Sequence, residues 1–215
     1  MMTVLPLAKI GLLLNKPAYV EEAKRQFLLH IHYLSDRKTG LWFHGWTFED
    51  GGHNFASALW ARGNSWITIA IPEMLELLGL PGSDAFVVHM STALNAQVAA
   101  LLKHQDESGL WRTLLDHPVS EGSYLEASAS AGFAYGMLKG LRLRLVEGDE
   151  YRDAAVKAVK GVLGKIDAKG ELQEVSFGTA MGRDLQHYKD IPLTSMPYGQ
   201  AMAIMMLGEF LRVFI

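Results

Sequence analysis

The sequence predicts an all-α protein of the α/α toroid type, in which an outer ring of helices surrounds an inner ring. Helices with one apolar face alternate along the 215-residue chain with helices that are apolar nearly all round. The links between them are short and long in turn, and the long links begin alike. A complete ring of six helical hairpins has twelve helices, and this chain accounts for about seven. We therefore expect residues 1–215 to form one toroid domain, incomplete on its N-terminal side; a smaller but complete helical bundle is the alternative.

Residues 17–34 are the first of three predicted amphipathic helices. Apolar side chains recur there every three or four residues, while Glu, Lys and Arg fall on the other faces. Residues 84–104 repeat this pattern behind Ser83, a residue type suited to cap a helix N-terminus, and residues 150–166 repeat it again. Each of these helices is expected to face water on one side, as a member of the outer ring.

Four other segments carry apolar or small residues on nearly every side, which is typical of helices buried on most sides. They are residues 1–14, 64–79, 124–146 and 197–214. Residues 126–136 are rich in Ala, Gly and Ser, so neighbouring helices can approach this segment closely. Pro72 either kinks its helix or marks the start of that helix, because proline interrupts helical hydrogen bonding.

The long links show an internal repeat with a period near 65 residues. They open with Asp36-Arg-Lys-Thr-Gly-Leu-Trp42, Asp106-Glu-Ser-Gly-Leu-Trp111 and Asp167-Ala-Lys-Gly-Glu-Leu172. The repeated aspartates suit ordinary turns and are not assigned as a catalytic pair. The first predicted helix belongs to the inner ring and lacks an outer partner before it. The missing helices, about five by this count, are therefore expected upstream.

Composition excludes several classes of partner and chemistry. The net charge is −3 and the 20 Lys and Arg residues form no runs, so we expect no binding to nucleic acid or to an anionic membrane. The absence of cysteine excludes disulfides, thiolate zinc sites and cysteine nucleophiles, and agrees with the cytoplasmic location that we expect. The apolar N-terminus lacks the features of a signal peptide, and no apolar stretch is expected to reach the ~20 residues that cross a bilayer.

Because helices alternate in direction, all the long links must emerge on one face, which is the candidate site. All five tryptophans lie in or beside these links: Trp42, Trp46, Trp60, Trp66 and Trp111. Four histidines are expected on the same face: His44, His53, His117 and His187. Five indoles together suggest a platform on which sugar rings stack, although each tryptophan could instead anchor its own loop to the body of the protein.

The segment Trp60-Ala-Arg-Gly-Asn-Ser-Trp66 combines an arginine, two indoles and a helix start. The planar guanidinium of Arg62 matches a carboxylate, so this segment suits an anion. The alternative is that Arg62 pairs with a carboxylate of the protein. The candidates for that pair are Glu49, Asp50 and Glu126.

We expect neither a metal nor a cofactor. His30 and His32 lie two residues apart on a helix and therefore face different sides. The sequence contains no metal-type spacing of His and carboxylates, no nucleophile elbow, no phosphate loop and no dinucleotide fingerprint.

Four motifs together resemble glycoside hydrolase family 105, the unsaturated rhamnogalacturonyl hydrolases. They are Gly40-Leu-Trp-Phe-His-Gly-Trp46, Trp60-Ala-Arg-Gly-Asn-Ser-Trp66, Ser123-Tyr-Leu-Glu-Ala-Ser-Ala129 and His187-Tyr-Lys-Asp-Ile-Pro-Leu-Thr-Ser-Met-Pro-Tyr-Gly199. The similarity runs from Met1 to Ile215 and corresponds to the carboxy-terminal part of that family. The resemblance implies an (α/α)6 barrel and a disaccharide substrate, 4,5-unsaturated galacturonic acid linked to rhamnose. It implies hydrolysis by hydration of the enol ether double bond.

The resemblance also implies roles for individual residues. His44 should contact the uronyl ring, Arg62 its carboxylate, and Trp60 and Trp66 should wall the subsite. The family's general acid is an aspartate that opens an inner helix, and residues 1–7 match the residues just after it, so that aspartate is expected immediately before Met1. This chain therefore supplies no catalytic residue of its own. An unsaturated glucuronyl hydrolase and a non-catalytic sugar-binding remnant are the alternative functions, and a homo-oligomer is possible.

Overall fold

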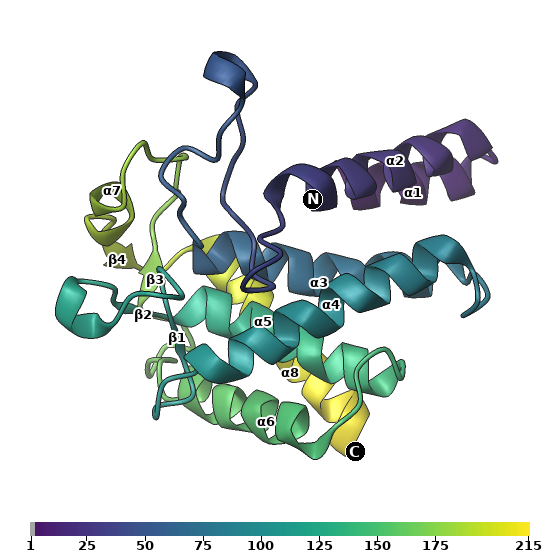
Figure 1. The fold of residues 1–215 in the computed structure, drawn as a ribbon. Helices are drawn as coiled ribbons and strands as arrows, with labels where there is room; N and C mark the ends of the chain where they lie inside the picture. Colours follow the sequence, from purple (N-terminus) through teal and green to yellow (C-terminus); the bar gives the residue numbers. More distant parts are fainter. Residues whose placement is uncertain (1–2) are drawn as a thin grey trace.

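The computed structural model describes residues 3–215 and contains seven long helices and one short helix within that range. The long helices are α1 (Val4–Leu13), α2 (Pro17–Leu34), α3 (Ala61–Leu78), α4 (Ala85–His104), α5 (Ala127–Arg142), α6 (Asp149–Leu163) and α8 (Pro197–Phe214). The short helix α7 spans Gln186–Lys189. Helix α5 lies between α3 and α8 and is covered by α6, as the alternation of inner and outer helices predicts (Figure 1).

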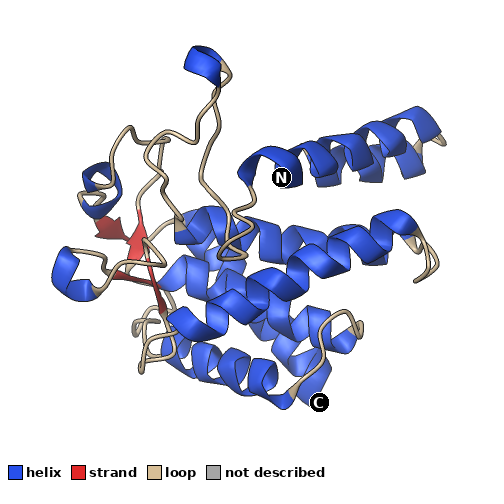
Figure 2. Ribbon diagram, viewed as in Figure 1, coloured by secondary structure: helices blue, strands red, loops and turns tan. Residues whose placement is uncertain are grey.

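The long links lie at one end of the helices and contain short strands and 3-10 helices (Figure 2). Strand β1 (Trp111–Arg112) pairs antiparallel with β2 (Leu125–Glu126), and β3 (Val175–Ser176) pairs with β4 (Leu193–Thr194). Two short 3-10 helices, Glu49–Gly51 and Val119–Glu121, complete this end. The strands are too short to show a sequence periodicity, which is why only the helices were predicted.

The repeated aspartates form the turns that were predicted for them. In each link the carboxylate accepts a hydrogen bond from the backbone N–H two residues later: Asp36 from Lys38, Asp106 from Ser108 and Asp167 from Lys169. This geometry is the usual Asx turn. The three carboxylates are therefore committed to local structure.

Two details of the helix starts correct the sequence prediction. Asp84, and not Ser83, caps α4, because its side chain accepts a hydrogen bond of 2.8 Å from the N–H of Phe86. Helix α3 begins at Ala61, so Pro72 lies inside the helix and does not mark its start. Proline has no N–H, and the carbonyl of Thr68 one turn earlier consequently loses its helical partner.

Small residues allow α5 to approach α3 closely, as predicted. A Cβ atom added at Gly136 would collide with the backbone carbonyl oxygen of Thr68. A Cβ atom at Gly132 would approach the Cβ atom of Ser65 to 2.9 Å. Every residue from Ala127 to Gly140 is buried. Helix α5 is therefore the central helix of the described residues 3–215.

The expectation that no apolar stretch is long enough to cross a bilayer is wrong for helix α4. It is 20 residues long with a mean hydropathy of 1.4, which is enough by length and composition to cross a membrane. One face of α4, which includes Met90, Leu94 and Leu101, is fully buried in the core. The capping aspartate and this buried face are typical of a core helix in a globular protein.

The first and last inner helices expose apolar side chains, in contrast to α5. On α1, Ile10 is 44% exposed and Leu13 is 83% exposed. On α8, Ile204 is 69% exposed and Leu211 is 53% exposed, seven residues apart on one face. These two helices therefore carry apolar surface that the described residues 3–215 leave exposed.

Self-association through these two helices is expected, because contiguous exposed apolar surface favours protein contacts. Introducing charge with Ile204→Glu and Leu211→Glu should shift the 215-residue chain toward monomer in light scattering coupled to gel filtration. Val88→Glu, at an exposed apolar residue of α4, is the matched control and should change nothing. A monodisperse wild-type monomer would contradict this expectation.

The close contact of α3 and α5 predicts opposite effects for two Gly to Ala changes. Gly136→Ala should lower the free energy of unfolding by about 1–3 kcal/mol, because the two helices must separate. Gly208→Ala on α8 meets nothing within 4 Å and should raise that free energy by about 0.5–1 kcal/mol. Urea unfolding of both variants measures the difference. Equal effects would show that the close contact of Gly136 with Thr68 does not determine the free energy of unfolding.

Candidate functional site

A cavity of about 220 Å³ opens between α2, the following loop and the N-terminal end of α3. It is lined by His30, Leu34, Trp42, Phe43, His44, Trp60, Gly63, Trp66 and Ile67. Three of the four predicted site residues, His44, Trp60 and Trp66, therefore lie around one cavity. The fourth, Arg62, lies behind its wall.

The buried amide of Asn64 fixes the loop to α3. Its Oδ1 accepts a hydrogen bond of 2.8 Å from the N–H of Trp42, and its Nδ2 donates to the carbonyls of Trp42 (2.8 Å) and Trp60 (3.0 Å). Gln97 of α4 donates to the Asn64 carbonyl at 2.9 Å. Asn64 is 1% exposed, so these bonds form away from water. The positions of Trp42 and Trp60 are set by this one side chain.

His44 packs against the Trp60 ring, with ring centroids 4.2 Å apart. Its Nδ1 lies 2.8 Å from the hydroxyl of Tyr188, a residue of α7. Burial above all, together with the positive charges of Arg62 and His187, lowers the pKa of His44 to about 4. The imidazole is therefore neutral at neutral pH.

Arg62 is 3% exposed and donates hydrogen bonds to the protein from two of its three nitrogens. Nη1 donates to the Ser176 carbonyl at 2.7 Å and to the Ser176 hydroxyl, and Nη2 donates to the Phe177 carbonyl (3.1 Å) and Thr179 Oγ1 (2.9 Å). The carboxylate of Glu126 lies 3.7 Å from Nη1. The pairing with a protein carboxylate, considered from the sequence as an alternative, is therefore present with Glu126.

The two other candidate partners, Glu49 and Asp50, are exposed on the loop that follows Trp46. The Arg62 guanidinium is also held between two aromatic rings. Its carbon lies 4.7 Å from the ring centres of both Trp60 and Tyr198. Arg62 therefore joins α3 to the segment around β3 and braces Trp60 from behind.

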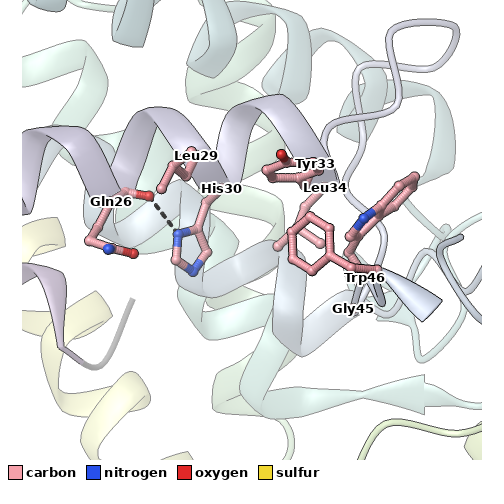
Figure 3. A pocket seen from close by; sticks show the side chains of 8 residues that line it. Gln26, Leu29, His30, Tyr33, Leu34, Gly45 and Trp46 are labelled. Atoms are coloured by element: carbon pink, nitrogen blue, oxygen red, sulfur yellow. Dashed lines mark hydrogen bonds between the residues drawn. The ribbon is translucent and has the colours of Figure 1, made fainter. Parts of the chain in front are cut away.

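The five tryptophans do not form one platform, which corrects the sequence prediction. Trp111 is completely buried, stacks edge-on against Phe133 and donates its indole N–H to the Leu101 carbonyl at 2.8 Å. Trp46 lines a second cavity of about 310 Å³ with Phe48 and with Tyr33 of α2, next to the first cavity (Figure 3). The reading that each indole anchors its own loop is therefore right for Trp111.

The four histidines that were expected on one face do not gather at one site either. His44 lines the cavity, whereas His187 contacts the far side of Tyr188 and bonds the Ala180 carbonyl at 2.9 Å. His53 stacks on Phe55, and His117 pairs with Asp116 at 2.9 Å. Only His44 of these four is placed among the residues that line the cavity within residues 3–215.

Two site residues were not assigned roles from the sequence. Tyr188 and Tyr198 lie in the motif 187–199, and contact His44 and Arg62 respectively. Their sequence signal was membership in that motif. Their function depends on contacts across more than a hundred residues, which no local pattern reveals.

The described part of the chain, residues 3–215, contains no group of three or more His, Asp or Glu residues placed to hold a metal ion. Glu126 is fully buried, and its carboxylate accepts hydrogen bonds from Ser128 Oγ, the Ala129 N–H and the Ser176 N–H. No carboxylate is among the described residues that line the cavity. The arrangement can therefore bind and orient a ligand through aromatic faces and through the imidazoles of His30 and His44.

Comparisons with known proteins agree with this fold. The model of Glycosyl Hydrolase Family 88 matches residues 1–214. The unsaturated rhamnogalacturonyl hydrolase YesR of Bacillus subtilis is 32% identical over 213 residues, which are 99% of this chain and 58% of that protein. A solved structure of a possible family 105 member from Salmonella enterica serovar Paratyphi A is 62% identical, with a TM-score of 0.96 over 100% of this chain and 56% of that one.

A solved family 105 glycoside hydrolase from C. acetobutylicum is 25% identical, with a TM-score of 0.84 over 97% of this chain and 62% of that chain. These matches confirm the resemblance to family 105 and the α/α-barrel fold class. The chain spans between half and two thirds of the length of these relatives.

The buried contacts of Arg62 predict that its first role is structural. Arg62→Ala should lower the free energy of unfolding by about 3–5 kcal/mol, because it leaves the buried Glu126 carboxylate without its cation. Adding Glu126→Gln should recover part of this loss. Arg152→Ala, which removes an exposed pair with Asp149, is the control and should cost less than about 1 kcal/mol in the same urea titration. An unchanged stability of Arg62→Ala would instead favour a free guanidinium kept for ligand.

Proposed function

Because the chain belongs to Glycosyl Hydrolase Family 88, we propose that it is the substrate-binding part of a hydrolase for unsaturated uronyl sugars. The proposed substrate is 4,5-unsaturated galacturonic acid linked to rhamnose, the substrate class that the name of YesR indicates for that relative. The single observation that supports it best is the cavity where His44, Trp60 and Trp66 meet.

The cavity suits a uronyl ring. Indole faces pack against the apolar face of a sugar, and a neutral imidazole exchanges hydrogen bonds with its oxygens. We propose that Trp60 and Trp66 wall the ring and that His44 contacts its polar edge. Arg62 contributes positive charge from behind Trp60, and the influence of this charge already reaches the His44 imidazole. A uronate carboxylate held near His44 would be stabilised by the same field.

The proposed reaction hydrates the enol ether double bond. A proton is added to one alkene carbon, water attacks the other, and the resulting hemiketal opens to release rhamnose. An acid must supply that proton. His44 is a poor candidate because its pKa of about 4 leaves it neutral, and a neutral imidazole holds its remaining proton tightly.

We therefore propose that the general acid is the aspartate expected immediately before Met1, at the start of the inner helix that α1 continues. An aspartate at the N-terminal end of that inner helix would lie on the same face as the cavity. In this proposal residues 1–215 are part of one toroid domain whose catalytic carboxylate lies upstream. The cytoplasmic location stays a prediction from the cysteine-free composition.

An activity assay with two chains tests the function. The 215-residue chain and a version extended upstream through the aspartate are compared by loss of the ultraviolet absorbance of the conjugated uronate. Because a positioned general acid contributes about 10² to 10⁴ in rate, the short chain should be slower by that factor. Comparable turnover by both chains would refute an upstream acid.

Calorimetry with the same disaccharide then tests binding separately from catalysis. The extended chain should bind it, and His44→Ala should weaken binding. His53→Ala, in the same loop but outside the cavity, is the matched control and should not. Binding without turnover by the extended chain would favour the non-catalytic remnant. Faster turnover of a glucuronyl substrate than of the galacturonyl one would favour the glucuronyl hydrolase.

A further inference from the structure

Two polar groups contact the Tyr188 hydroxyl, behind the cavity. The backbone N–H of Gly182 donates to Tyr188 Oη at 3.1 Å, and His44 Nδ1 lies 2.8 Å from the same oxygen. Tyr188 is 1% exposed, so water is not a partner for this hydroxyl. Each donor in the group must therefore find its acceptor within the group.

Only one placement of the protons satisfies this requirement. Gly182 is necessarily a donor, so Tyr188 Oη accepts from it. If His44 Nδ1 also carried a proton, the hydroxyl proton of Tyr188 would have no acceptor among residues 3–215. A buried unpaired donor of this kind is rare and costly. The hydroxyl of Tyr188 must then donate to an unprotonated Nδ1.

We propose that Tyr188 is a positioning residue that holds His44 in the tautomer with its proton on Nε2. The lowered pKa of His44 agrees with this assignment, since it keeps the ring neutral and leaves one proton to be placed. The burial that raises the pKa of Tyr188 keeps its hydroxyl protonated, as a donor must be. The orientation of the ring is fixed at the same time, because it packs at a tilt against Trp60 and in a T-shaped arrangement with Tyr188.

The tautomer of His44 decides which ligand atoms the cavity recognises, an inference that rests on the proposed function. His44 Nε2 makes no hydrogen bond within the described residues 3–215, so its N–H is free for ligand. The site then presents a donor, which pairs with a carboxylate, a ring oxygen or a hydroxyl acting as acceptor. The opposite tautomer would present a lone pair and repel the same oxygens. Tyr188 thereby selects for a ligand acceptor without touching the ligand.

Nitrogen NMR of the histidine rings tests the assignment. In the histidine-labelled chain near pH 7.5, the long-range proton–nitrogen pattern of His44 should show protonated Nε2 and unprotonated Nδ1. His30 is the internal control with the opposite tautomer, because its Nδ1 lies 2.7 Å from the Gln26 carbonyl, to which it must donate (Figure 3). A protonated Nδ1 on neutral His44 would overturn the proposal.

Tyr188→Phe keeps the buried ring and removes only the hydroxyl. The His44 nitrogen shifts should then move toward a mixed-tautomer average while those of His30 stay in place. Tyr33→Phe, in the second cavity, is the matched control and should leave His44 unchanged. Unchanged His44 shifts in Tyr188→Phe would also overturn the proposal.

The affinity for the unsaturated disaccharide tests the role of Tyr188 and the proposed function separately. Tyr188→Phe in the upstream-extended chain should bind the unsaturated disaccharide roughly two- to tenfold more weakly, the range for one hydrogen bond. If the wild-type extended chain binds no such sugar while the NMR pattern holds, the substrate assignment fails and the role of Tyr188 stands. Full affinity in Tyr188→Phe would show that the tautomer does not control binding and would overturn the selective role.

Discussion

The side-chain amide of Asn64 is the interaction on which the candidate site depends. One buried group satisfies both the N–H and the carbonyl of Trp42 and also bonds the carbonyl of Trp60. It lies in the first turn of α3 and is supported in turn by Gln97 of α4. The loop that carries His44 is thus tied to the inner and outer rings at one point. Every backbone group that this loop brings into the interior at Trp42 finds its partner there.

The electrostatics of the site follow from how Arg62 is buried. Its charge is only partly offset by Glu126, at 3.7 Å, because that carboxylate is itself engaged by Ser128 and by backbone N–H groups. The burial of His44 is the main cause that keeps its imidazole neutral, and the positive charge that remains on Arg62 disfavours a second cation in the same direction. The buried charge of Arg62 therefore adds to the effect of burial on the charge state of the cavity.

Local chemistry predicted much of the fold, and long-range contacts decided the rest. The Asp turns and the alternation of helix types depend on residues close in sequence, and the structure contains both. Trp42 and Trp111 follow the same Gly-Leu pattern and are both buried in the core, yet of the two only Trp42 also lines the cavity. No local feature separates them, because the difference lies in which helix each indole meets.

The site also combines residues that local sequence predicts with contacts that only the fold determines. His44, Trp60 and Trp66 follow from their motifs, since all three lie within one stretch of the chain. The partners of Arg62 are more than a hundred residues away, at Ser176 and Phe177, and Tyr188 is 144 residues from His44. A sequence offers the possible partners of such residues, and the topology of the ring chooses among them.

The hairpin of α1 and α2 packs mainly on itself and touches the rest of the ring lightly, through α3 (Figure 1). His30 and Leu34 of this hairpin form one wall of the cavity, and Trp60 and Trp66 of the rigid core form the other. The cavity therefore lies at the seam between this hairpin and α3. Its width depends on how the hairpin docks on α3, so local opening of this seam and access to the cavity are a single physical variable.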